Sequence, residues 1–255
     1  MSTDLIVYQP PQQGVATVLL NRPQKKNAIT LAMYDGLAAA IAAAESDPDV
    51  RVLVIAAAGD NFTAGNDLED FLNQPADRTE WPVTRFLHGI AAARKPLVAA
   101  VGGVAIGIGT TLLLHCDLVI ASRTARFQLP FVDLGLVPEA ASSLLLPRLV
   151  GHVRAAELLL LGDAFDADAA LAYGLINRVV DPDALLATTT AFAVRLAAKN
   201  PASVRHTKAL MKAAPTDIVT RMDEEAAIFA SQLSTPEAKA AFAAFFARRA
   251  SGRKP

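Results

Sequence analysis

The sequence predicts an α/β protein with largely parallel strands and a helical carboxyl-terminal region. Strand-like and helical runs alternate from the amino terminus to about Val180, a pattern typical of parallel strands connected by helices. Beyond this residue only helical runs occur. Hydrophobic residues make up 53% of the 255 residues and charged residues 19%, a composition that supports a large buried core.

The first elements are two short apolar runs, at 5–9 and 14–20, which predict a hairpin or two neighbouring strands. A helix is expected at 31–47, because Thr30 can accept a hydrogen bond from its first turn. The apolar run at 51–58 predicts a buried strand. The elements expected next are a mostly helical segment at 67–94 with Pro82 as an interruption or first-turn residue, a strand at 97–101, a glycine-rich turn at 102–109, a helix at 110–116 and a strand at 117–122.

The carboxyl-terminal region is predicted to be purely helical. Its helical runs lie at 183–199, 201–214, 216–233 and 236–249. The change in pattern near Asp181 to Asp183 predicts a core at 1–181 and a helical region at 182–255. The helices are amphipathic, and their spacing fits packing on a neighbouring subunit as well as packing within the chain.

The charge and the cysteine and histidine content argue against several classes of function. A formal net charge of −1 offers no field for nucleic acid, and the single Cys116 cannot form an internal disulfide. The four scattered histidines match no metal or hydrolase signature, so no metal site is expected. The first ten residues do not resemble a signal peptide, and no apolar run is long enough to span a membrane. We therefore expect a soluble, cytoplasmic protein.

One carboxylate stands out in the segment FVDLGLVPEAASS. Glu139 directly follows a proline and precedes small and apolar residues. A carboxylate removed from water finds a partner or has its pKa raised, so Glu139 is a candidate base. The alternative is structural, because a helix predicted at 140–151 would place the side chain beside free backbone N–H groups. From this segment alone the structural alternative is favoured.

Two loops that follow strands have the composition of an oxyanion site. VGGVAIGIGTT fails the phosphate-loop and dinucleotide templates, since Ile108 replaces the lysine and GIGTTL lacks a third glycine. NFTAGNDLEDF places Asn66 and Asp67 after a small-residue turn. Two such loops at the ends of separate strands can direct N–H groups at one oxygen, although glycines also serve close packing.

Several longer segments can be compared with known families by their order and spacing. They are NRPQKKNAIT, FTAGNDL, KPLVAAVGGVAIGIGTTLLLHCDLVIAS, FQLPFVDLGLVPEAASSLLLPRLVG and AAELLLLGDAFDADAALAYGLINRVV. In this order and spacing they resemble the enoyl-CoA hydratase/isomerase family, or crotonase superfamily, over nearly the whole chain. The resemblance implies a crotonase-like spiral of ββα units and a helical end that builds homotrimers or homohexamers. It also implies a hole for the acyl-CoA thioester oxygen, made by the N–H groups of Asn66 and Ile108, and no cofactor beyond the coenzyme A of the substrate.

The departures from the hydratase pattern favour another reaction. The places of the two hydratase glutamates hold Thr111 and Phe131, neither of which can be a carboxylate base. Glu139 stands where hydratases commonly have glycine, and this resembles the peroxisomal-type Δ3,Δ2-enoyl-CoA isomerases, whose base is a glutamate in that segment. The resemblance therefore implies that Glu139 is catalytic. Moving a double bond needs one base, whereas hydration uses two carboxylates.

The expected activity is isomerisation of a 3-enoyl-CoA to a 2-trans-enoyl-CoA in fatty acid β-oxidation, with Glu139 moving a proton from C2 to C4. The alternatives are hydration or another crotonase-type reaction, and acyl-CoA binding without catalysis. Asp133 ranks second as an acid, and Lys26, like Lys25, can meet CoA phosphates or remain solvated. The residues that the resemblance places around the substrate are Lys25, Ala28, Ala64, Gly65, Asp67, Leu68, Gly107 and Phe131. For Asp67 the favoured interpretation is that it caps the helix after its loop, and for Leu68 and Phe131 a core position is at least as good an interpretation.

Overall fold

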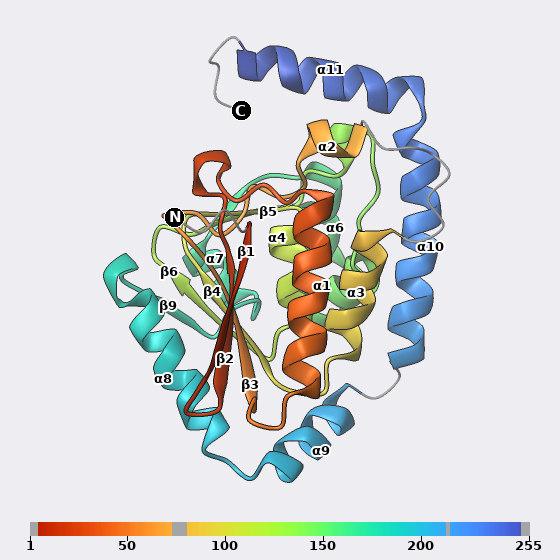
Figure 1. Ribbon diagram of the computed structural model, residues 1–255. Helices are drawn as coiled ribbons and strands as arrows, with labels where there is room; N and C mark the ends of the chain where they lie inside the picture. The colour runs from red at the N-terminus through yellow and green to blue at the C-terminus, as the bar shows by residue number, and fades with distance from the viewer. Residues whose placement is uncertain (1–4, 73–80, 213–214, 251–255) are drawn as a thin grey trace.

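A six-stranded sheet forms the centre of the computed structural model, which describes residues 5–72, 81–212 and 215–250 (Figure 1). The strands, in spatial order, are β1 (Ile6–Gln12), β2 (Val15–Leu20), β3 (Val52–Ala57), β4 (Leu97–Val101), β6 (Leu118–Ser122) and β9 (Arg178–Val180). β1 and β2 pair antiparallel, and every later neighbour in this sheet pairs parallel. The predicted hairpin and the predicted parallel α/β architecture are therefore confirmed.

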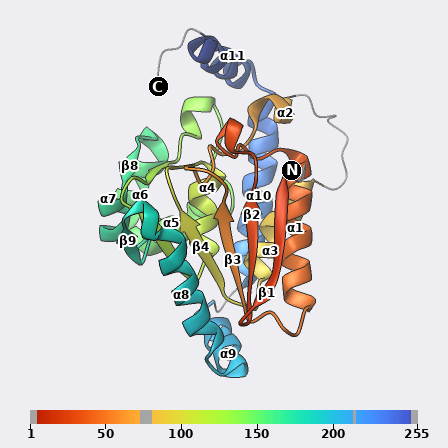
Figure 2. The same cartoon turned by 60° about the vertical axis from the view of Figure 1, so that its left-hand side comes forward.

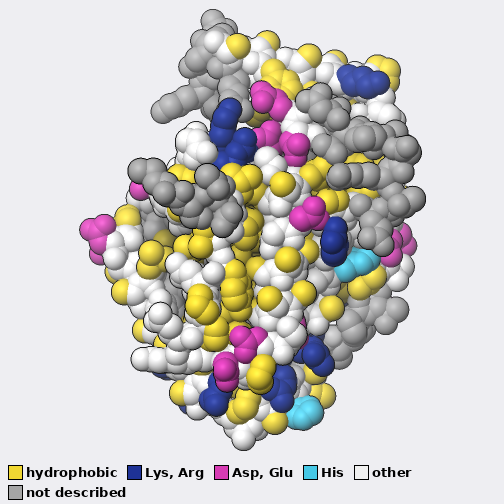
Figure 3. Space-filling view, viewed as in Figure 1, with side chains coloured by type: hydrophobic (Ala, Val, Ile, Leu, Met, Phe, Trp, Pro, Cys, Tyr) yellow, Lys and Arg dark blue, Asp and Glu magenta, His cyan; other side chains and the backbone are white. Residues whose placement is uncertain are grey.

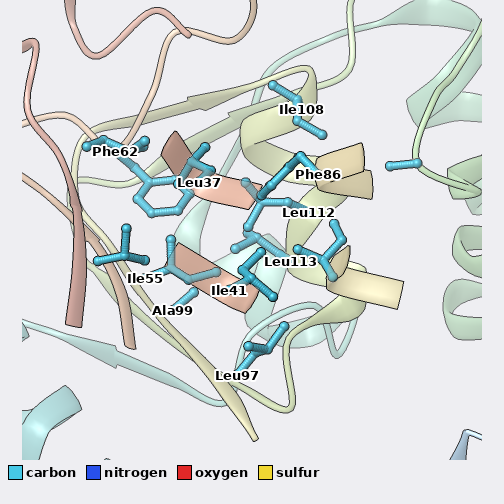
Figure 4. Close-up of a cluster of buried hydrophobic side chains, with 14 of the residues drawn as sticks. Leu37, Ile41, Ile55, Phe62, Phe86, Leu97, Ala99, Ile108, Leu112 and Leu113 are labelled. Carbon is cyan, nitrogen blue, oxygen red and sulfur yellow. The ribbon is translucent and has the colours of Figure 1, made fainter. Parts of the chain in front are cut away.

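Helices cover both faces of this sheet because its strands are apolar on both sides. Leu53 and Ile55 of β3 belong to the cluster beneath α1 (Leu31–Ser46) and α3 (Pro82–Ala92), drawn in Figure 4. Val52 and Val54 of the same strand belong to the cluster beneath α8 (Leu185–Ala197). Figure 2 shows α8 on one side of the sheet and α1 with α3 on the other. A strand buried on both faces reads as a continuous apolar run, as 51–58 does.

The helix boundaries follow local signals that the sequence analysis used. The Thr30 side chain accepts a hydrogen bond from Met33 N at 3.3 Å, which confirms the expected cap of α1. Pro82 is a first-turn residue of α3, and α2 (Leu68–Leu72) is the other described helix of the predicted 67–94 segment. Residues 73–80 of that segment lie outside the described residues.

A second, three-stranded sheet corrects the expectation of a simple turn at 102–109. It consists of β5 (Val104–Ile106), β7 (Arg126–Gln128) and β8 (Phe165–Asp166). β5 pairs parallel with β7, a strand distant in sequence, so local composition gave no sign of it. The helix expected at 110–116 begins earlier, as α4 (Ile108–Thr111) followed by the 3₁₀ helix η2 (Leu112–His115). The other short elements are η1 (Pro23–Lys25), η3 (Val132–Leu134), α5 (Ser142–Val150), α6 (His152–Ala156), the π-helical turn η4 (Glu157–Leu161), α7 (Ala167–Ala172) and η5 (Pro182–Ala184).

After β9 the described chain is helical, as expected. α8 is followed by α9 (Pro201–Met211), α10 (Pro215–Leu233) and α11 (Pro236–Ala250). α10 packs against α3 and α5, and α11 contacts η3. Figure 1 shows α10 along one side of the molecule and α11 across its top. A role for residues 182–255 in trimer formation stays a prediction. None of the described helices is both long enough and apolar enough for a bilayer crossing.

Candidate active site

Three loops at the carboxyl ends of β2, β3 and β4 are joined by backbone hydrogen bonds. Asn66 pairs with Ile29 as a parallel bridge, in which Ile29 N donates to Gly65 O at 2.8 Å and Asp67 N donates to Ile29 O at 2.8 Å. Thr63 pairs with Ala105 in the same way, and Ile106 N donates to Thr63 O at 3.0 Å. The two loops that the sequence analysis selected therefore lie side by side.

The N–H groups of Asn66 and Ile108 are free of these backbone pairings. In the bridge to Ile29 the partners are Gly65 O and Asp67 N, so the N–H of Asn66 points to the other side of its strand. Ile108 is the first residue of α4, and a first-turn N–H has no acceptor within its helix. The Ile108 side chain is fully buried and belongs to the cluster in Figure 4, which holds the backbone in place. Both N–H groups are thus available to an oxygen atom.

Two glycines shape these loops: Gly65 permits their close approach, and Gly107 has a backbone conformation that favours glycine. Gly65 has φ +87°, and a Cβ added to it would lie 2.8 Å from Ile106 O. Gly107 has φ +56° and donates from its N–H to Gln128 O at 2.9 Å. Any other residue at position 65 would be strained and would collide with the backbone before Ile108.

Glu139 is buried beside the loop that contains Asn66. Glu139 is only 7% exposed, and its Oε1 atom has no hydrogen-bond partner among the described residues. Burial and then the charge of Glu225 raise the pKa of Glu139 to about 8, although a hydrogen bond from the Asn66 side chain opposes the rise. The helix-cap alternative fails, because the first free N–H groups of α5 bind Glu225 instead. An acid with such a pKa can accept and return a proton near neutral pH.

Asn66 connects Glu139 to Tyr34, a residue that the sequence analysis missed. The Tyr34 hydroxyl donates to Asn66 Oδ1, which orients the amide so that its NH₂ group faces Glu139. Tyr34 is fully buried in α1 and packs against Phe86, with the ring centroids 5.4 Å apart. Burial, with a smaller contribution from Glu139, raises the pKa of Tyr34 well above its usual value, so the hydroxyl stays a donor. Tyr34 is the one aromatic residue of α1, and this was the available signal.

The places of the hydratase glutamates contain no acid. Thr111 is buried, and its hydroxyl has no hydrogen-bond partner among the described residues. Phe131 is buried in a cluster with Leu129 and Leu136, and Leu68 packs against the same cluster. For both Phe131 and Leu68 the structure therefore shows a core contact, which was one of the two readings left open.

The other predicted site residues lie around the joined loops. Asp67 forms an ion pair with Arg22 at 2.5 Å and accepts from Asp70 N at 3.4 Å. Burial would raise the pKa of Asp67, but the bonds from Arg22 and the backbone outweigh it and lower the pKa. Asp67 is thus a paired helix-start residue, while Asp133 is exposed on η3.

Lys25 and Lys26 are exposed in the loop that contains η1, and Ala28 and Ala64 are half-buried in the joined loops. Figure 3 shows basic side chains beside acidic ones at the upper end of the face it draws. Across the described ranges, no three His, Cys, Asp or Glu side chains are grouped so that they could hold a metal ion.

The spiral of strands and helices, with a small second sheet beside the strand-end loops, is the crotonase fold. A crystal structure of an enoyl-CoA hydratase/isomerase from Pseudoalteromonas atlantica T6c superposes with a TM-score of 0.91 at 42% identity, over 99% of each chain. Residues 11–252 match the family model described as enoyl-CoA hydratase/isomerase, and the chain belongs to this family.

Relatives whose names give different activities are equally similar to this chain. A probable enoyl-CoA hydratase from Rhizobium meliloti (strain 1021) is 36% identical, over 93% of this chain and 93% of its own. Enoyl-CoA delta isomerase 2 from Rattus norvegicus is also 36% identical, over 83% of this chain and 56% of its own. Overall similarity therefore does not distinguish hydration from isomerisation, and the site residues must do so.

Proposed function

We propose that the protein isomerises a 3-enoyl-CoA thioester to the 2-trans-enoyl-CoA thioester. The observation that carries the proposal is the buried carboxyl of Glu139, whose pKa is raised to about 8 and which accepts a hydrogen bond from the side chain of Asn66. The backbone N–H of the same Asn66 lies in one of the two joined loops. A proton acceptor and a donor to the thioester oxygen are therefore neighbours.

The proposed reaction uses these groups in order. The thioester oxygen accepts hydrogen bonds from Asn66 N–H and Ile108 N–H, which makes the C2 protons more acidic. The ionised Glu139 removes one of them, and the electron pair spreads over a dienolate whose oxygen both N–H groups stabilise. Glu139 then delivers the proton to C4, and the double bond moves to C2–C3. One carboxyl is sufficient, because the proton removed is the proton returned.

Hydration is the second candidate, favoured by names such as that of the Rhizobium meliloti relative. It requires a positioned water and a proton for carbon, which two carboxylates provide together. Thr111 and Phe131 stand at the positions of the two hydratase glutamates. The hydroxyl of Thr111 and the ring of Phe131 can neither activate a water nor donate a proton to carbon as a carboxyl does. We therefore expect weak hydration beside efficient isomerisation.

The direct test is a comparison of two substrates with one preparation of the protein. Conversion of a 3-enoyl-CoA to the 2-trans product should be at least about a hundredfold faster than hydration of crotonyl-CoA, since one cooperating acid or base contributes about 10²–10⁴-fold. Both reactions can be followed by absorbance of the conjugated thioester, with chromatography to identify the products. A hydration rate equal to or above the isomerisation rate would contradict the proposal.

The pH dependence of isomerisation should reflect the raised pKa of Glu139. Because the ionised form is the base, kcat/KM should rise with pH and level off above about 8, the pKa of the buried carboxyl. An unperturbed carboxyl would give a profile that is already flat above about 5 to 6. A kcat/KM series between pH 5 and pH 9.5, in buffers of constant ionic strength, distinguishes the two.

The remaining expectations are part of the same proposal. Coenzyme A enters as part of the substrate, and Lys25 and Lys26, both exposed, are available to its phosphates. Assembly into trimers or hexamers and a cytoplasmic location, both expected from the sequence, remain proposals. Leu68 and Phe131 line the acyl channel in this proposal, which requires that the cluster they share borders the bound acyl chain.

A further inference from the structure

The turn that presents Glu139 has an unusual backbone. Ala140 and Ala141, the two residues after the base, both have positive φ, at 61° and 54°. Residues other than glycine seldom adopt this conformation, and they keep it only where the surrounding structure enforces it. Something in the tertiary structure must therefore hold the turn.

The strongest restraint comes from Glu225 of α10, more than eighty residues away in sequence. Glu225 Oε2 accepts from Ala141 N at 2.6 Å. Glu225 Oε1 accepts from Ser143 N at 3.0 Å and from Ser143 Oγ at 2.5 Å. The residue is only 5% exposed, and its carboxylate takes the place of a cap at the start of α5.

A second restraint acts on the other side of the turn. His115 Nε2 lies 2.8 Å from Ala140 O, and since a carbonyl only accepts, this nitrogen carries the hydrogen. Burial lowers the pKa of His115 to about 4, so the ring is neutral at physiological pH. Ser142 Oγ also donates to Glu139 O at 2.7 Å. Of these groups, only Glu225 brings a second carboxyl close enough to raise the pKa of Glu139.

We propose that Glu225 is a positioning residue, which holds the left-handed turn so that the Glu139 carboxyl faces Asn66. In that place the charge of Glu225 also opposes ionisation of Glu139. The inference rests on the proposed role of Glu139 as the base. It gives the carboxyl-terminal region a part in the site, because the geometry of the reacting carboxyl depends on a residue of α10.

The groups around the carboxyls of Glu139 and Glu225 determine the pH at which each of the two ionises. Glu139 faces Tyr34 from α1, Asn66 from its loop and Glu225 from α10. Burial raises the pKa of Glu225, while the bonds from Ser143 and Ala141 and the charge of Arg221 oppose the rise. His115 stays neutral, so Glu225 is the neighbour whose charge acts on the ionisation of Glu139.

The decisive variant is Glu225→Gln, with Glu224→Gln as its matched control. Glu224 is the preceding residue of α10, but its side chain is 58% exposed and paired with Arg221. In Glu225→Gln the amide keeps the shape but cannot accept all three bonds, so kcat should fall about tenfold to a hundredfold with little change in KM. The rise of kcat/KM with pH should also move to lower pH, because a charge that opposes ionisation of Glu139 is gone. Glu224→Gln should change neither.

Glu225→Asp separates the effect of the charge from the effect of the side-chain length. It retains the charge but shortens the side chain, so kcat should fall while the position of the pH rise stays near that of the unmodified protein. This variant also keeps the inference testable if Glu225→Gln does not fold. An unchanged kcat and pH profile in either folded variant, even with a lower melting temperature, would make Glu225 a purely structural residue and overturn the inference.

A failure of the inference can be distinguished from a failure of the proposed function. The ionisation of Glu139 is measurable without substrate, from the carboxyl band in infrared difference spectra between each protein and its Glu139→Gln counterpart. A shift of this titration to lower pH in Glu225→Gln supports the inference even if the unmodified protein fails to turn over a 3-enoyl-CoA. An unshifted titration contradicts it even if isomerisation is efficient.

Discussion

Glu139→Gln is expected to lower the rate of 3-enoyl-CoA isomerisation by about 10³-fold or more, toward the upper end of the usual contribution of a general base. Glutamine has nearly the same size and can still accept the hydrogen bond from Asn66, so the pocket should keep its shape. The lost function is proton transfer alone. Accordingly kcat should collapse while KM changes little, which steady-state kinetics on purified protein will show.

The same substitution should stabilise the fold at high pH. The pKa of Glu139 is about 8 in the folded protein against an ordinary value of 4.5, so the folded state binds more protons than the unfolded state between these values. The stability of the unmodified protein therefore falls as pH rises through this interval, and an uncharged glutamine avoids the loss. Urea unfolding should show a larger free energy of unfolding for Glu139→Gln at pH 9, and little difference at pH 4. Full activity of Glu139→Gln would show that Glu139 is not the base. Equal stability of the two proteins at pH 9 would show that the pKa of Glu139 is not raised in the folded protein.

Gly65→Ala is expected to reduce kcat by about a hundredfold or more, the usual cost of losing one oxyanion-hole donor. The added Cβ would lie 2.8 Å from Ile106 O, and φ at this residue is +87°, so the loop has to shift. The shift moves the neighbouring N–H of Asn66 relative to that of Ile108. The N–H groups belong to the backbone and cannot be removed by a side-chain substitution, so displacing the loop is the accessible test.

Gly89→Ala is the matched control for this prediction. Gly89 lies within α3, and a Cβ there meets nothing nearer than 3.8 Å. Alanine is a better helix former than glycine, so this variant should be fully active and slightly more stable. If Gly65→Ala, shown to be folded by circular dichroism, has the kcat of the unmodified protein, the donors do not lie where the joined loops place them.

Most strands of the larger sheet could be predicted from the sequence because their signals are local, although β9 was not among them. The apolar runs at 51–58 and 97–101 became β3 and β4, and the cap at Thr30 became the start of α1. β5 was missed, since its three residues are held by pairing with β7 rather than by their own composition. A strand stabilised by a distant partner leaves little trace in its own residues.

The candidate site, like the fold, has features that the sequence determined and features that only the tertiary structure decided. The sequence by itself determined the chemical types: a lone carboxyl at Glu139, small residues and glycines before Asn66 and Ile108, and no acid at Thr111 or Phe131. Tertiary structure alone decided that Tyr34 orients the Asn66 amide and that Glu225 holds the turn after Glu139. The physical reason is that residue type limits which reactions are available, whereas pKa and orientation depend on burial and on neighbours from other parts of the chain. Tyr34 and Glu225 come from α1 and α10, and only the folded chain brings them to one carboxyl.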